Sequence, residues 1–162
     1  MKTLIVYYSM TGNVKFAAEK LSAALKADLL RVEPVKAYPD KGFKKFFWGG
    51  KSAVMGEAPA LEPYSFSADD YDLIVFGFPV WAGTFAPPLR TFISENRGAL
   101  SSKRIAALAC SSGGNAAKAF EKLSALAGKE LEASLSLTDP KARPTDKTNG
   151  DIARFAASLE KE

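Results

Sequence analysis

Uncharged hydrogen-bond donors are concentrated near the amino end of the chain, between an apolar run at residues 4–8 and a stretch with helical periodicity. They belong to the segment formed by Ser9, Met10, Thr11, Gly12, Asn13 and Val14. A strand-to-helix turn of this kind points backbone N–H groups outward at a helix N-terminus, where the helix dipole favours an anion. Gly12 permits close approach of the backbone or a positive φ. The pattern predicts a phosphate site, and a simple capped helix start is the alternative.

Acid–base and metal chemistry have few candidates in this sequence. The chain contains no histidine and one cysteine, Cys110. Histidine-based catalysis, serine–histidine triads and most zinc sites are therefore excluded. Cys110 ends a predicted buried strand, where a free cysteine is usually an inert small hydrophobe. Any chemistry is therefore expected to come from carboxylates, hydroxyl groups, the single thiol or a bound cofactor.

Apolar runs and helical periodicities alternate along the whole sequence. We predict strands at residues 2–8, 28–32, 71–78, 104–110 and 131–137. We predict helices at residues 14–25, 41–55, 87–98, 116–127 and 152–159, with a loop at 79–86 and a polar loop at 138–149. This alternation is typical of a parallel sheet covered on both faces, in a single domain spanning residues 1–162.

Three strand ends carry loops rich in small and polar residues, and in an open parallel sheet ligands bind beyond the carboxyl ends of the strands. The first loop is residues 9–14. The second contains Pro79, Val80, Trp81, Ala82 and Gly83, and the third contains Ser111, Ser112, Gly113, Gly114 and Asn115. Small residues let a flat group approach the backbone, and Trp81 is either a wall for that group or a core aromatic. Together the loops predict a pocket for a phosphorylated planar cofactor.

The segment Ser-Met-Thr-Gly-Asn-Val at residues 9–14 resembles the phosphate loop of flavodoxins, usually written T/S-x-T-G-N-T. The resemblance covers the length, the strand–helix alternation and all three loop positions. It implies an α/β, flavodoxin-like doubly wound sandwich, with a five-stranded parallel sheet of order 2-1-3-4-5 and helices on both faces. It also implies FMN as the cofactor, its phosphate held by residues 9–14. Residues 79–83 would then border the isoalloxazine ring, with the Ala82-Gly83 peptide at flavin N5, and residues 111–115 would contact the pyrimidine end.

The chain departs from electron-transfer flavodoxins in three ways. Val14 replaces a common threonine, and the third loop lacks the usual acidic residues and stacking tyrosine. The net charge is +4, whereas those flavodoxins are strongly acidic. Fewer acidic groups near the ring lower the electrostatic penalty for the anionic reduced flavin, so we expect a higher reduction potential.

The resemblance implies a flavodoxin-type electron-transfer protein that shuttles electrons between redox partner proteins. An FMN-dependent NAD(P)H:quinone-type reductase and a regulatory flavin-binding module are the alternatives. The basic balance favours partners with acidic docking surfaces. We expect a cytoplasmic monomer that binds neither nucleic acid nor membrane, because no signal peptide or spanning segment is visible. The basic aromatic segment 43–52 is either an amphipathic helix, or a docking surface or partial lid over the flavin.

Overall fold

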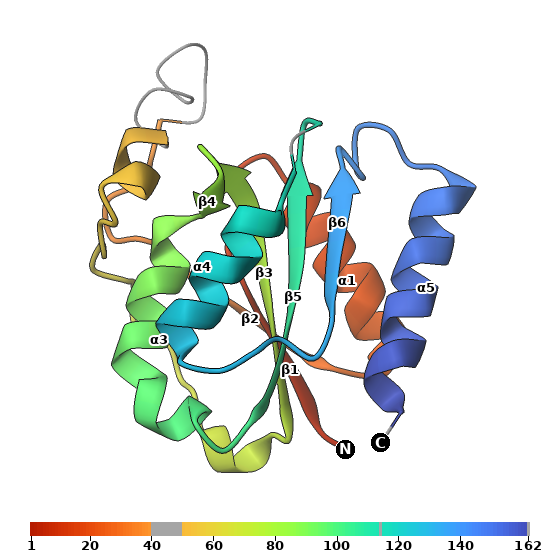
Figure 1. Ribbon diagram of the computed structural model, residues 1–162, viewed down its shortest axis with the longest axis horizontal. Coiled ribbons are helices and arrows are strands. Elements are labelled where there is room, and N and C mark those ends of the chain that lie inside the picture. Colours follow the sequence, from red (N-terminus) through yellow and green to blue (C-terminus); the bar gives the residue numbers. More distant parts are fainter. Residues whose placement is uncertain (40–49, 114, 162) are drawn as a thin grey trace.

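The computed structural model describes residues 1–39, 50–113 and 115–161, which form a sheet between two layers of helices (Figure 1). The strands are β1 (Thr3–Tyr7), β2 (Asp28–Arg31), β3 (Leu73–Trp81), β4 (Thr84–Phe85), β5 (Arg104–Ser111) and β6 (Ser134–Thr138). The helices are α1 (Asn13–Leu25), α3 (Pro87–Leu100), α4 (Ala117–Ala127) and α5 (Asp146–Glu160), with a 3₁₀ turn, η1 (Ala68–Asp70). None of the described helices has the length and apolar content needed to cross a membrane.

The sheet has the strand order β2-β1-β3-β5-β6, with all neighbours parallel. The predicted order 2-1-3-4-5 is confirmed, because β5 and β6 are the fourth and fifth strands of the prediction. The additional strand β4 pairs with the end of β3 in antiparallel fashion, Val80 opposite Phe85 and Trp81 opposite Thr84. It lies off the main path of the sheet.

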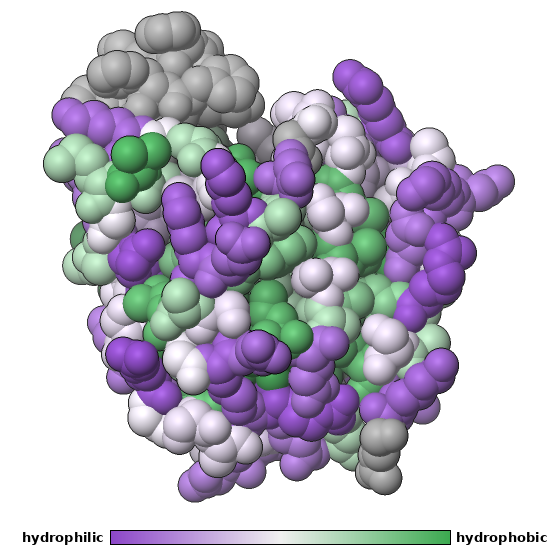
Figure 2. Space-filling view, in the orientation of Figure 1, coloured by the Kyte–Doolittle hydropathy of each residue, from purple (hydrophilic) through white to green (hydrophobic). Residues whose placement is uncertain are grey.

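Alternate side chains of the central strands enter two separate cores, as the period of a β-strand requires. The α3 and α4 face buries side chains such as Ile74, Phe76, Leu89, Phe92 and Leu123. The α1 and α5 face buries Ile5, Val75, Leu21, Ile152 and Phe155. In the face seen in Figure 2, hydrophilic side chains are prominent over the helices, and hydrophobic ones lie mostly nearer the centre. The two cores, one under α3 and α4 and one under α1 and α5, confirm the prediction that helices cover both faces of the sheet.

The predicted loop at residues 79–86 is wrong. Residues 79–81 continue β3 instead, and a two-residue turn returns the chain into β4. Ala82 and Gly83 both have positive φ, 49° and 73°. Positive φ at both positions is the geometry of the tight hairpin turns whose twist suits adjacent strands. Alanine rarely adopts positive φ, so the sequence concealed this turn.

Other predicted boundaries also differ from the structure, most of all at the start of the last strand and of the last helix. β6 begins at Ser134 rather than at residue 131. α5 begins at Asp146, within the predicted loop 138–149, because the Thr145 side chain accepts a hydrogen bond from the Thr148 N–H and caps a polar first turn. Residues 50–54 are helical, and the rest of the helix predicted at 41–55 lies largely outside the described residues.

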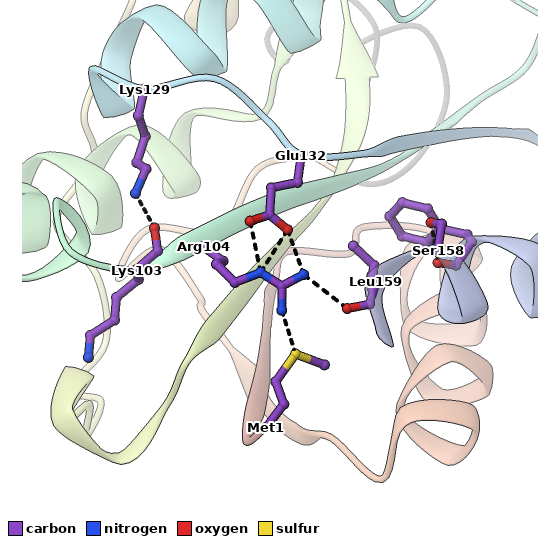
Figure 3. Close-up of polar contacts among 8 residues, drawn as sticks. Met1, Lys103, Arg104, Lys129, Glu132, Ser158 and Leu159 are labelled. Atoms are coloured by element: carbon purple, nitrogen blue, oxygen red, sulfur yellow. Dashed lines mark hydrogen bonds and ion pairs between the residues drawn. The ribbon is translucent and has the colours of Figure 1, made fainter. Parts of the chain in front are cut away.

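At the end of the sheet opposite the loops, Arg104 makes a group of polar contacts (Figure 3). Arg104, at the start of β5, pairs with Glu132 at 2.7 Å. Its guanidinium also donates to the Leu159 carbonyl oxygen at 3.0 Å and to the Met1 sulfur at 2.8 Å. One side chain thereby ties together the amino terminus, β5, the chain leading to β6 and the end of α5.

Candidate cofactor site

The loop after β1 is held by hydrogen bonds to residues of α1 and β2. The buried Ser9 hydroxyl accepts a hydrogen bond from the Lys15 N–H in the first turn of α1, at 3.1 Å. The Ser9 carbonyl oxygen accepts one from the Arg31 guanidinium at 2.9 Å, and Arg31 is itself paired with Glu33. Gly12, with φ 93°, precedes α1 in the left-handed conformation. These contacts fix the loop so that it meets the positive end of the α1 dipole.

A distant part of the chain also supports this loop. The Lys141 backbone N–H, in the segment between β6 and α5, donates to the Asn13 side-chain oxygen at 3.0 Å. With its oxygen occupied in this way, the Asn13 amide nitrogen is left as a donor. The exposed Thr11 hydroxyl is a second side-chain donor at the same end of α1.

Aromatic rings form the wall at the hairpin between β3 and β4. Trp81 packs edge-on against Tyr38, with ring centroids 5.2 Å apart, and against Tyr8 at 5.7 Å. Tyr8 and Tyr38 are also in contact at 6.4 Å. Burial raises the pKa of both tyrosine hydroxyls, so both rings are neutral at physiological pH. The two tyrosine rings hold Trp81 in a defined orientation without placing a charge beside it.

Residues from the three predicted loops line one pocket. The predicted residues in its lining are Ser9, Met10, Thr11, Asn13, Val14, Pro79, Val80, Trp81, Ala82, Ser111 and Ser112. Gly12, Gly83, Gly113 and Asn115 lie in the same loops but outside the lining. The Asn115 side chain instead accepts a hydrogen bond from the Ala117 N–H at 2.8 Å, at the start of α4. Gly114 lies outside the described residues.

The pocket also contains residues that the sequence analysis did not select. Gly50, Cys110 and Asp139 line it. Asp139 follows β6 and has φ 40°; its N–H donates to the Ser111 carbonyl oxygen at 3.0 Å. Asp139 lies beyond the carboxyl end of a strand, so the rule that selected the other loops would also have found it. Gly50 begins the described part of the 43–52 segment, and a Cβ there would lie 3.7 Å from the Ala82 Cβ.

Neutral hydrogen-bond donors and small residues dominate the pocket chemistry. Burial, with a smaller effect from Asp139, raises the pKa of the Cys110 thiol to about 12, so the thiol stays protonated near neutral pH. The described residues contain no cluster of carboxylates and cysteine able to hold a metal ion. The arrangement can bind an anionic group at α1 and a flat group between the hairpin and the β5 loop.

Known proteins share this fold and its sequence pattern. The flavodoxin family model matches residues 2–134. A flavoprotein from Lactobacillus acidophilus, solved in complex with FMN, is 23% identical with a TM-score of 0.76, and the match covers 96% of this chain and 98% of that one. The two-electron reduced flavodoxin of Megasphaera elsdenii is 17% identical with a TM-score of 0.58, covering 93% and 97%. Because the family match spans most of the sequence, the chain belongs to the flavodoxin family.

Proposed function

We propose that this flavodoxin binds FMN non-covalently in the pocket and carries electrons between redox partner proteins. The residues present fit the two ends of FMN. The loop at 9–14 offers uncharged donors and the α1 dipole to a phosphate. Trp81, Ala82, Ser111 and Ser112 line the same pocket, and they offer one aromatic ring and small residues to the flavin ring.

FMN supplies reversible one- and two-electron chemistry when bound, and the chain supplies binding, orientation and electrostatics. Residues 9–14 would hold the phosphate. The β3–β4 hairpin would position the ring, with the Ala82-Gly83 turn beside it. The turn is a defined hairpin structure, so it offers its backbone groups in one orientation.

One observation favours a carrier over an enzyme that depends on proton transfer by its own side chains. Among the described residues that line the pocket, the ionisable side chains are Cys110 and Asp139. Cys110 is protonated because burial raises its pKa to about 12, and it is 4% exposed. A substrate that needs proton transfer would therefore find one carboxylate, whereas electron transfer needs no proton-transfer group from the protein.

The third loop favours a second candidate, the FMN-dependent NAD(P)H:quinone-type reductase. Ser112 and Gly113 are exposed, and neither carries an aromatic ring that could cover the flavin. An uncovered ring face would admit a nicotinamide. The net charge of +4 supports partners with acidic surfaces for the carrier.

Anaerobic stepwise reduction of the FMN-loaded protein, followed by absorbance, separates the two candidates. Two resolved one-electron steps, with negligible NAD(P)H oxidation in the presence of a quinone, are expected for a carrier. A single two-electron step with rapid NAD(P)H-dependent quinone reduction would establish the reductase instead. Failure of the protein to take up FMN would contradict both.

A further inference from the structure

The segment between β6 and α5 reaches the loop at residues 9–14 and is held by hydrogen bonds from its backbone N–H groups. The Asp139 N–H donates to Ser111 O at 3.0 Å, and the Arg143 N–H donates to Asp139 O at 2.8 Å. Between them, the Lys141 N–H donates to Asn13 Oδ1 at 3.0 Å. The backbone of Lys141 is therefore hydrogen-bonded to Asn13 in the loop at 9–14, although Lys141 and Asn13 are far apart in sequence.

The Lys141 side chain lies along the backbone of Gly12. A Cβ built on Gly12 would lie 2.9 Å from Lys141 Nζ, 3.3 Å from Cδ and 3.7 Å from Cε. The end of the lysine thus occupies space that a side chain at position 12 would fill. Glycine at this position serves both the left-handed backbone, with φ 93°, and the approach of the ammonium group.

The neighbouring cations already have acidic partners. Arg31 pairs with Glu33, and Lys15 lies 3.8 Å from Glu19. Lys141 has no carboxylate within ion-pair distance among residues 1–39, 50–113 and 115–161. Its charge adds to the dipole of α1, whose first turn contains no acidic residue. A dianionic phosphate would supply the negative charge that is missing beside Lys141 and the first turn of α1.

We propose that Lys141 is a specificity-determining residue that pairs with the cofactor phosphate and makes the pocket select FMN over riboflavin. The proposal rests on the proposed FMN function but not on the family match, which ends at residue 134. A charge-assisted contact to phosphate is stronger than a neutral one, and it weakens as salt screens it. Lys141 acts on the phosphate alone, so it leaves the contribution of the ring unchanged.

The test measures the affinity of the apoprotein for FMN and for riboflavin, by quenching of flavin fluorescence at low and high salt. Lys141→Gln should weaken FMN binding by about 10-fold at low salt, with the difference shrinking at high salt, and should leave riboflavin binding within about 2-fold. Lys141→Arg, which keeps the charge, should recover most of the loss. Lys147→Gln is the matched control, because Lys147 is a nearby exposed lysine paired with Asp151.

The outcomes separate the inference from the function on which it rests. Equal FMN affinity in wild type and Lys141→Gln overturns the role of Lys141 and leaves the FMN site standing. An equal loss for FMN and riboflavin also overturns it, because a structural role would affect both ligands. A wild-type protein that binds neither flavin contradicts the proposed function itself.

Discussion

At the carboxyl end of the sheet, mostly neutral side chains line a pocket in which Asp139 is the one carboxylate of the described lining, whereas at the amino end charged side chains pair with one another. Arg104 pairs with Glu132 and bonds to Met1 and Leu159 at the amino end (Figure 3). At the carboxyl end, Thr11 and the Asn13 amide stay available to a ligand. The two ends are connected by the same five parallel strands.

The difference shows how one sheet separates stability from binding. A charged group that already has a protein partner contributes to the fold but offers little to a ligand. A hydrogen-bond donor that is held in place by its backbone and has no protein partner contributes little to the fold but is available to a ligand. Substitution of Arg104 should therefore change stability alone, and substitution of Thr11, which has no such structural contact among the described residues, should change cofactor affinity alone.

The largest effect is expected at Gly77, in β3 below the pocket. A Cβ there would lie 2.9 Å from the Tyr7 Cβ and 3.2 Å from the Val14 Cγ1, and the Tyr7 Cβ cannot move independently of its backbone. Gly77→Ala should lower the free energy of unfolding by ~3 kcal/mol, measured by urea denaturation. Gly98→Ala is the control, since nothing lies within 4 Å of its Cβ position in α3, and it should be stabilising. Equal effects at both glycines would refute the close approach.

Thr11 tests the pocket side of the comparison. Thr11→Ala removes an exposed hydroxyl that no described contact uses to hold the fold. It should weaken FMN binding by ~2 kcal/mol, the scale of a hydrogen bond to a charged group, without changing apoprotein stability. Thr138→Ala, at an exposed position of β6, is the control for both measurements. Unchanged FMN affinity in Thr11→Ala would remove this residue from the phosphate site.

Arg104 tests the opposite end. Arg104→Leu should lower the free energy of unfolding by ~1 kcal/mol, because the lost hydrogen bonds to a charged group lie at a partly exposed surface. The affinity for FMN should stay the same. A loss of FMN affinity comparable to that of Thr11→Ala would show that the two ends are coupled through the sheet.

Asp139 is expected to give the smallest effect, on the reduction potential. Asp139→Asn removes a negative charge from the pocket lining, and asparagine tolerates the positive φ of this position. The anionic reduced flavin should become easier to form, raising the potential by roughly 30 mV, or ~0.7 kcal/mol per electron. Asp146→Asn, in the first turn of α5, is the control, and an equal shift there would point to a general charge effect.

The sequence predicted the sheet and most of the pocket because their signals are local. Continuous apolar runs identify buried strands such as β3, and the alternation with helices determines which strands are parallel. The carboxyl ends of these strands then meet at one edge. Eleven of the residues selected on this basis line the pocket in the structure.

The remaining features depend on contacts that no local pattern encodes. Ala82 occupies a turn position that usually requires glycine or asparagine, so the hairpin was predicted as a loop. Lys141 contacts Asn13 because of the path that the chain takes between β6 and α5. In the sequence, nothing distinguishes Lys141 from other lysines that are expected to be exposed. Asp139 adds a carboxylate to the pocket lining from beyond β6, whereas the expectation of fewer acidic groups near the ring considered the loop after β5.

The most direct test of a pocket at one end of the sheet is an amide NMR titration of the ¹⁵N-labelled apoprotein with FMN. We expect the largest shifts at Thr11–Val14, at the Trp81 indole and at Ser111 and Ser112, with the signals of Arg104 and Glu132 unchanged. Shifts centred on Arg104 and Glu132, or none at residues 11–14, would contradict this expectation.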